Sequence, residues 1–227
     1  MRKNIAIIYY NTPDLTRALV NSIRKFTPDA NITVFDNSDF APFPKMDGVT
    51  VIDNTHGQVI DFEAMIARYP ERKRTINYYA SAKHIASVDK LFDILEDGFL
   101  LLDSDVLLLQ DVSGLFDTAV AWKGFAEQVP DASYHRVRLL PYCLWMNVPI
   151  LKRYGIRFWH DGMVDALDGS SPYYDTGASL LHDCTELNLP GSQVDIYDYI
   201  VHFGRGSYGK TWEHANEWLN KYKHLYE

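Results

Sequence analysis

The stretch GFLLLDSDVLLL, residues 98–109, decides the fold of this chain. Residues 99–102 form an uninterrupted apolar run, which is typical of a strand buried on both faces. The run ends at Asp103 and Asp105, whose two-residue spacing predicts that both side chains project to one side of the backbone. Carboxylates are rarely buried without a partner or a metal, so the pair predicts a site for a hard divalent cation. An ordinary turn built from Asp residues stays open as the alternative.

The first half of the chain alternates predicted strands and helices. Strands are expected at residues 4–10, 31–35 and 49–52, and helices at residues 13–26, 60–69 and 77–95. This order predicts an α/β fold with a mainly parallel central sheet flanked by helices. Ligands of such sheets bind beyond the carboxyl ends of the strands. The polar residues at or just after those ends, expected to line one crevice, are Asn11, Asp36, Asp53 and Asp103.

The first predicted helix has a recognisable start. Thr12 is its expected N-cap, Pro13 its first residue, and Asp14 lies in its first turn. One apolar face is expected to pack on the sheet, formed by Leu15, Leu19, Ile23 and Phe26.

The second half is less regular. A short helix is expected at residues 112–120, a strand at 121–126 and a final helix at 211–226. The aromatic residues between 134 and 159 fit either a sugar-binding rim or plain core. Because we find no repeat, low-complexity tract or linker, one domain is expected over residues 1–227, with a Rossmann-like nucleotide half at 1–118 and an acceptor half at 119–227.

Composition excludes several classes of protein. The formal net charge of -8 argues against a nucleic-acid partner, which needs a basic surface. No apolar stretch is long enough to span a bilayer, and the first residues lack the pattern of a signal peptide. Cys143 and Cys184 are the only cysteines, so a disulfide framework or a CxxC zinc site is excluded. We expect a cytoplasmic location, with peripheral attachment to a membrane through a partner left open.

The acid-ended second strand and the central LLDSDVLLL together resemble the nucleotide-sugar glycosyltransferases of the GT-A fold over about residues 4–118. Residues 201–212, VHFGRGSYGKTW, resemble the His-x-Gly…Lys-Pro-Trp ending of the glycogenin-like and lipopolysaccharide galactosyltransferase group, with Thr211 in place of Pro and a longer spacing from Gly204 to Lys210. YYNT and FDNSD near the N-terminus are more similar to the inverting chitin- and cellulose-synthase-like family. The chain matches neither group throughout, so retention or inversion at the transferred sugar stays open.

The resemblance implies roles for the matching residues. Asp103, Asp105 and His202 would hold Mn²⁺ or Mg²⁺ against the two phosphates of the donor, and an imidazole among oxygen ligands favours Mn²⁺. Lys210 and the backbone of residues 204–206 would contact the diphosphate, and Asp36 the base. The full set of implied nucleotide-sugar contacts is Asn11, Thr12, Asp36, Asn37, Lys83, Ser104, Gly204, Gly206 and Lys210.

Three of these positions have simpler interpretations. Asp36 could only start a turn, His202 could be a satisfied core histidine, and Lys83 could be a solvated helix residue. An inverting transfer would also need a carboxylate that takes the proton of the acceptor hydroxyl. Asp161 in WHDGM and Asp175 in YYDTG are the candidates for this base.

The sequence therefore predicts a metal-dependent glycosyltransferase. It would move a sugar from a UDP-, GDP- or TDP-linked donor to a glycan or lipid-linked saccharide, as in polysaccharide biosynthesis. A non-catalytic module that binds nucleotide-sugars or glycans is the first alternative. A haloacid-dehalogenase-like phosphatase is the second, and it is disfavoured because Leu107 stands where its motif has Thr or Val.

Overall fold

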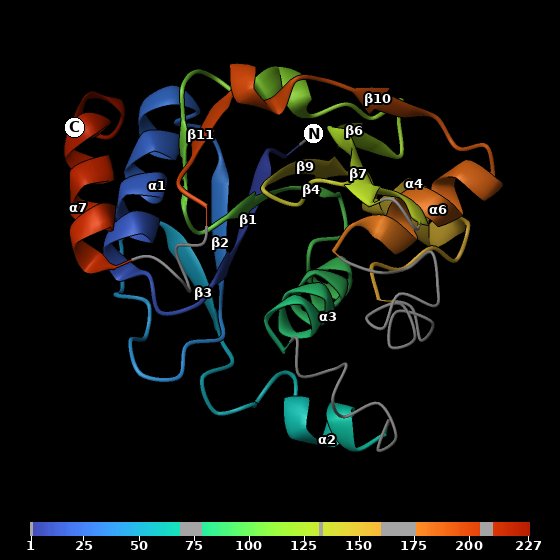
Figure 1. Cartoon of the computed structure of the whole chain (residues 1–227), viewed down its shortest axis with the longest axis horizontal. Coiled ribbons are helices and arrows are strands. Elements are labelled where there is room, and N and C mark those ends of the chain that lie inside the picture. Colours follow the sequence, from blue (N-terminus) through green and yellow to red (C-terminus); the bar gives the residue numbers. More distant parts are fainter. Residues whose placement is uncertain (1, 69–78, 132–133, 160–175, 205–210) are drawn as a thin grey trace.

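The computed structural model describes residues 2–68, 79–131, 134–159, 176–204 and 211–227 (Figure 1). Its centre is a seven-stranded sheet in the order β10-β6-β9-β4-β1-β2-β3. The strands of this sheet are β1 (Asn4–Tyr9), β2 (Asn31–Asp36), β3 (Val49–Asp53), β4 (Phe99–Asp103), β6 (Trp122–Gly124), β9 (Cys143–Met146) and β10 (Gly191–Gln193). Two small sheets pair β5 (Val106–Leu108) with β11 (Ile200–His202) and β7 (Ala126–Asp131) with β8 (Tyr134–Leu139).

The α-helices are α1 (Pro13–Phe26), α2 (Phe62–Ala67), α3 (Tyr79–Ile94), α4 (Val148–Arg153), α6 (Ala178–Glu186) and α7 (Trp212–Lys221). Single 3₁₀ turns are η2 (Ser113–Leu115), η3 (Ile196–Asp198) and η4 (Lys223–Leu225). Within the described part of the chain, no helix is both long and apolar enough to cross a bilayer.

The main sheet is mostly parallel, as the sequence predicts. β1 runs parallel to β2 and β4, β2 to β3, and β10 to β6. Only β9 is antiparallel to its neighbours, β4 and β6. The parallel strands end in register, since Tyr9 pairs with Asp36, Asp36 with Asp53, and Ile8 with Asp103. The polar residues at these ends therefore share one edge of the sheet.

The central strand β4 is buried on both faces, which explains its unbroken apolar run. Leu100 and Leu102 face a core cluster that includes the inward side of α1, whereas Phe99 and Leu101 face a second cluster that includes α3. Because successive strand residues point to opposite faces, both faces need apolar side chains. Helices α1 and α3 cover opposite sides of the sheet (Figure 1).

Thr12 occupies the expected N-cap position of α1, although its side chain makes no capping hydrogen bond. Three other local expectations are wrong. The helix expected at residues 112–120 is only the 3₁₀ turn η2, and the strand expected at 121–126 is divided between β6 and β7. The last predicted helix ends at Lys221, and η4 follows it.

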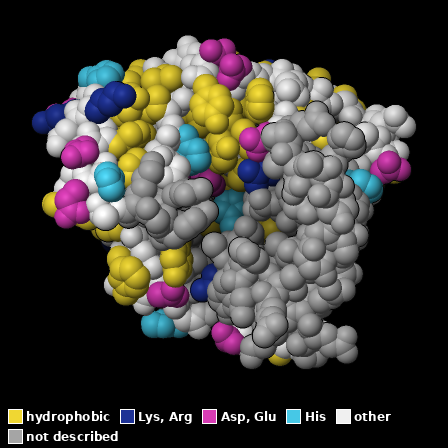
Figure 2. Space-filling view, viewed as in Figure 1, with side chains coloured by type: hydrophobic (Ala, Val, Ile, Leu, Met, Phe, Trp, Pro, Cys, Tyr) yellow, Lys and Arg dark blue, Asp and Glu magenta, His cyan; other side chains and the backbone are white. Residues whose placement is uncertain are grey.

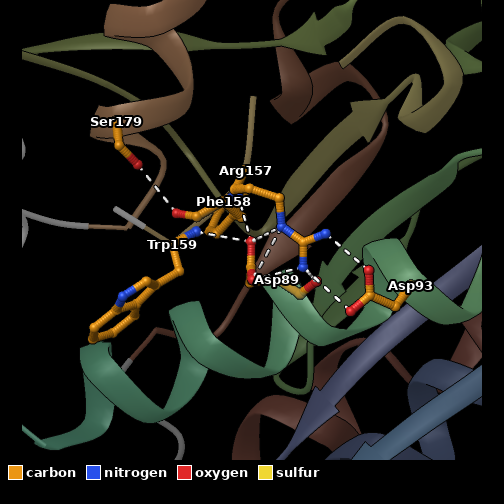
Figure 3. A network of polar contacts seen from close by, with 6 residues as sticks. All are labelled: Asp89, Asp93, Arg157, Phe158, Trp159 and Ser179. Atoms are coloured by element: carbon orange, nitrogen blue, oxygen red, sulfur yellow. Dashed lines mark hydrogen bonds and ion pairs between the residues drawn. The ribbon is translucent and has the colours of Figure 1, made fainter. Parts of the chain in front are cut away.

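Helix α3 is fixed to the second half of the chain by a polar network (Figure 3). The Asp89 carboxylate accepts hydrogen bonds from the backbone N–H groups of Phe158 and Trp159, at 2.9 and 3.0 Å. Arg157 Nη2 donates to Asp89 Oδ2 at 2.8 Å, and Arg157 Nη1 donates to Asp93 Oδ1 at 2.8 Å. The segment that follows α4 is thus held against one side of α3.

Candidate functional site

The turn between β4 and β5 lies at the carboxyl edge of the sheet. It consists of Ser104 and Asp105, which are 8% and 7% exposed. Thr12 Oγ1 donates to Ser104 Oγ at 3.1 Å, and Thr16 Oγ1 donates to the Ser104 carbonyl at 3.3 Å. Two threonines at the start of α1 therefore hold the turn that follows Asp103.

His202 reaches this turn through the pairing of β11 with β5. In this antiparallel pair His202 lies opposite Val106, directly after Asp105. The backbone N–H of Phe203 donates to the Asp105 carbonyl at 2.9 Å, which extends the pairing by one bond. His202 Nε2 then lies 3.2 Å from Asp105 Oδ1, although the two residues are 97 positions apart in sequence. His202 thus lies beside an acidic side chain at this edge of the sheet, and its role as a metal ligand stays a prediction.

Asp103, Asp105 and His202 form a cluster that could hold a divalent cation. Their ligand atoms lie within 4.8 Å of one another. Two carboxylates and one imidazole suit Mn²⁺ and related ions, whereas a tightly closed zinc site normally has four protein ligands. The residues present therefore fit the metal that the resemblance implies.

Two further side chains contact this cluster, and the sequence did not indicate them. His84 on α3 places Nε2 3.1 Å from Asp103 Oδ1. The ring of Tyr142, which precedes β9, stacks on the His202 imidazole with centroids 4.1 Å apart and planes at 30°. Neither residue belongs to a motif or lies near its partner in sequence. Only the placement of α3 and β9 around the turn reveals them.

Asn11, at the end of β1, shapes the neighbouring loop. Its φ of 52° lies in the left-handed region, which Asn tolerates better than most residues. Its Oδ1 accepts hydrogen bonds from the backbone N–H groups of residues 39, 40 and 41, at 3.2, 3.2 and 3.1 Å. One side chain at the rim thus fixes the loop that follows β2.

Asp36 holds the same loop from its other end. It is 3% exposed, and its two oxygens accept from the backbone N–H groups of Ser38 and Phe43, at 2.9 and 2.8 Å. The turn that the sequence left open as an alternative is therefore present. A contact between Asp36 and a nucleotide base stays a prediction.

Asn37 joins a buried amide network below this loop. Its Nδ2 donates to Ser87 Oγ on α3 at 2.8 Å, and its Oδ1 accepts from Asn54 Nδ2 at 2.9 Å. Asn54 Oδ1 in turn accepts from the backbone of Val59 and Ile60, at 3.0 and 2.8 Å. The network ties the ends of β2 and β3 to helix α3.

Lys83, on α3, lies near the loop that Asn11 and Asp36 hold. Its side chain is 19% exposed, so the interpretation as a solvated helix residue is wrong. The ammonium lies 5.3 Å from the Phe62 ring centroid, 5.7 Å from that of Tyr10, and 3.7 Å from Asp39 Oδ1. The Tyr10 hydroxyl donates to Asp39 Oδ2, and this hydrogen bond raises the pKa of Tyr10 to about 12. A cation is therefore held in place at this rim.

The remaining predicted site residues are only partly described. Gly204 has a φ of 69°, and a Cβ placed there would meet only His202 Cε1, at 3.9 Å. No described residue would crowd a side chain at this position, and the positive φ is what favours glycine. The other predicted residues, Asp161, Asp175, Gly206 and Lys210, lie outside the described residues.

Figure 2 shows histidine, acidic and basic side chains close together near the centre of the face seen in Figure 1. This grouping agrees with the contacts described above, which are made by residues at the ends of β1, β2 and β4 together with α3 and β11. The molecule is otherwise acidic, with a formal net charge of -8, so a phosphate ligand would need such local cations.

Comparison with solved structures confirms the fold. The apo form of the glycosyltransferase GlyE of Streptococcus pneumoniae TIGR4 matches with a TM-score of 0.53 and 13% identity over 98% of this chain and 64% of that one. A second GlyE structure matches with a TM-score of 0.50 and 13% identity over 99% of this chain and 50% of that one. The galactosyltransferase LgtC, in complex with donor and acceptor sugar analogues, matches with a TM-score of 0.50 and 15% identity over 85% of this chain and 73% of that one.

The chain thus spans between half and two thirds of the length of the GlyE structures. No protein-family model matches it, and no curated protein sequence does. At these identities the likeness establishes the architecture, and the chain has the GT-A-type fold of nucleotide-sugar glycosyltransferases.

Proposed function

We propose that this chain is a metal-dependent glycosyltransferase that uses a nucleotide-activated sugar. The observation that carries the proposal is the cluster of Asp103, Asp105 and His202, with ligand atoms within 4.8 Å, at the carboxyl edge of a GT-A-type sheet. This edge is where α/β sheets bind their ligands.

The chemistry of the reaction needs this arrangement. Breaking the bond between the sugar and the phosphate leaves extra negative charge on the nucleoside diphosphate. A divalent cation at the cluster would stabilise that charge as it develops. Mn²⁺ is the proposed ion because one ligand is an imidazole.

The residues around the cluster would contact the nucleotide, the diphosphate and the acceptor. The loop held by Asn11 and Asp36 would form the nucleotide rim, and Lys83 would place a cation beside it. Lys210 and the glycines at 204 and 206 would contact the diphosphate, and Asp161 or Asp175 would take the proton of the acceptor hydroxyl. The proposed donor is UDP-, GDP- or TDP-linked, and the proposed acceptor is a glycan or lipid-linked saccharide. A cytoplasmic location stays a prediction.

The first test is thermal stability against UDP, GDP, TDP and CMP and representative sugar adducts, each with Mn²⁺ and with EDTA. We expect one nucleoside diphosphate to raise the melting temperature selectively, and EDTA to remove the effect. The absence of any nucleotide response in folded, Mn²⁺-loaded protein would contradict the proposal. A response without release of nucleoside diphosphate from any donor would favour the non-catalytic binding module.

The Asp105→Ala variant tests the metal ligands. We expect it to weaken Mn²⁺-dependent nucleotide binding by more than about 100-fold, since even an outer partner of a metal ligand contributes about 10–100-fold. Isothermal titration calorimetry measures the effect. The matched control is Asp97→Ala, because the Asp97 side chain is exposed in the turn before β4, at the opposite end of this strand from the cluster. An unchanged affinity in Asp105→Ala would contradict the metal assignment.

A further inference from the structure

His84 contacts the proposed metal cluster, although no sequence motif indicates it. Its Nε2 lies 3.1 Å from Asp103 Oδ1, and the two side chains are 18% and 23% exposed. A contact at this distance between an imidazole nitrogen and a carboxylate oxygen is a hydrogen bond in which the imidazole donates. Asp103 accepts this bond with one oxygen and keeps further lone pairs for another partner.

The tautomer of His84 follows from its neighbours. Nε2 must carry a hydrogen, because an imidazole lone pair facing a carboxylate would be repelled. Nδ1 is buried and has no hydrogen-bond partner among the described residues. An unpaired buried nitrogen opposes folding, so an apolar side chain would serve stability better at this position. We therefore expect this histidine to orient Asp103 and not to stabilise α3.

Helix α3 is fixed firmly enough to set that orientation. On one side, Ser87 accepts a hydrogen bond from Asn37, in the loop after β2, at 2.8 Å. On the other side, Asp89 binds Arg157 and the backbone that follows it (Figure 3). His84 lies one turn before these anchors. It is thus held at a defined distance from β4 by contacts that do not involve the metal cluster.

We propose that His84 is a positioning residue that holds the Asp103 carboxylate in the orientation needed to ligate the cation. The inference rests on the proposed function, because it assumes that Asp103, Asp105 and His202 bind Mn²⁺. Without the bond from Nε2, the Asp103 carboxylate could rotate about its terminal torsion, which is broad and nearly free. Loss of a partner that orients a metal ligand typically weakens metal affinity by about 10–100-fold.

The test compares Mn²⁺ binding in five proteins, including Asp105→Ala, measured from the electron paramagnetic resonance signal of free Mn²⁺ during titration. His84→Leu removes the donor, and His84→Gln returns an N–H group at a similar reach. His182→Leu on α6 is the control, because that histidine pairs with Asp183 outside the cluster. Wild type gives the reference affinity.

We expect His84→Leu to weaken Mn²⁺ binding by about 10–100-fold. We expect His84→Gln to recover most of the affinity, and His182→Leu to match wild type. The melting temperature of His84→Leu in EDTA should be equal to or above that of wild type, since the unpaired nitrogen is gone. A purely structural role would give the reverse pattern, with lower stability and unchanged affinity in the folded variant.

Three outcomes overturn the inference. If His84→Leu binds Mn²⁺ as wild type does while Asp105→Ala does not, the metal site stands and His84 does not position it. If His84→Gln binds as weakly as His84→Leu although both are folded, the N–H donor is not what matters. If wild type itself binds no Mn²⁺, the proposed metal site fails, and the role of His84 fails with it.

Discussion

Burial changes the chemistry of Cys143 and Cys184. Their exposed fractions are 0% and 1%. Desolvation raises the pKa of each thiol to about 12, and Asp183 adds to the shift at Cys184. Since the thiolate is the reactive form, we expect neither cysteine to react with Ellman's reagent near pH 8 in the folded protein. Both should react in denaturant, and rapid labelling of the native protein would contradict the packing of β9 and α6.

The same two thiols predict how stability depends on pH. An unfolded cysteine has a pKa of about 8.5. The folded pKa is about 12 at both sites, so folding keeps the proton on the thiol. Stability from this source is complete below the unfolded pKa and is lost as pH rises toward the folded pKa. We expect the urea midpoint to fall as the pH rises from about 8.5 toward about 12. Replacing both cysteines by Ala should reduce this dependence, and an unchanged slope would contradict the assignment.

How much of the site is predictable depends on the sequence distance of each contact. The strand at residues 99–102 and the acids after it were predicted because the pattern is local. His202 was predicted from a resemblance, and the structure brings it to 3.2 Å from Asp105. His84 and Tyr142 were missed because packing of separate elements creates their contacts. No residue pattern near either one encodes its partner.

At the scale of elements, residues 112–120 show why one helix prediction failed. Asp111 Oδ1 accepts from the backbone N–H of Ser113, and Asp117 Oδ1 accepts from that of Ala119, both at 2.9 Å. Such local bonds offer the backbone an alternative to helical hydrogen bonds. The Asp117 carbonyl also accepts from Trp145 Nε1 at 2.9 Å. The chain satisfies its polar groups here without a helix, which apolar periodicity cannot reveal.

Two acidic residues of α3 bind the same arginine, and we expect their replacement to lower the stability of the protein unequally. Asp89 accepts from Arg157 and from two backbone N–H groups, with its side chain 19% exposed. Among the described residues, Asp93 forms hydrogen bonds with Arg157 only, and its side chain is 46% exposed. We expect Asp89→Ala to lower the free energy of unfolding by about 2–3 kcal/mol, because charged hydrogen bonds are lost and N–H groups are left unpaired. Asp93→Ala should cost less than about 1 kcal/mol.

Urea unfolding of the two variants measures this difference. Asp93→Ala is the matched control, because it lies on the same helix and removes a bond to the same guanidinium. Equal losses in the two variants would mean that the backbone bonds to Asp89 contribute little. The second half of the chain would then be held on α3 by apolar packing alone.

At the scale of the whole molecule, the two halves share one sheet. β9, β6 and β10 come from the second half and extend the sheet beyond β4. β11 returns to pair with β5, and Lys25 of α1 donates to the His224 carbonyl at 2.6 Å. A single domain over residues 1–227 stays a prediction, and this topology gives it a physical reason. The pairings of β4 with β9 and of β5 with β11 would both be lost if either half unfolded.

One cooperative transition is therefore expected in urea. All five tryptophans lie between residues 122 and 218, so their fluorescence reports on the second half. Far-UV circular dichroism also reports on α1 and α3 in the first half. Coincident transitions from the two probes are the test of two-state unfolding. Fluorescence that changes at lower urea than circular dichroism would instead mean that the second half unfolds separately.

Adding Mn²⁺ gives a second test of cooperative unfolding, because its proposed ligands come from both halves. A ligand that binds only the folded state at about 100 times its dissociation constant adds about 2.7 kcal/mol of stability. If the halves are one unit, Mn²⁺ should raise the midpoints of both probes together, and EDTA should reverse the shift. Asp105→Ala should remove the shift from both. A shift of the fluorescence transition alone would mean that His202 and its strand dock onto an independently stable first half.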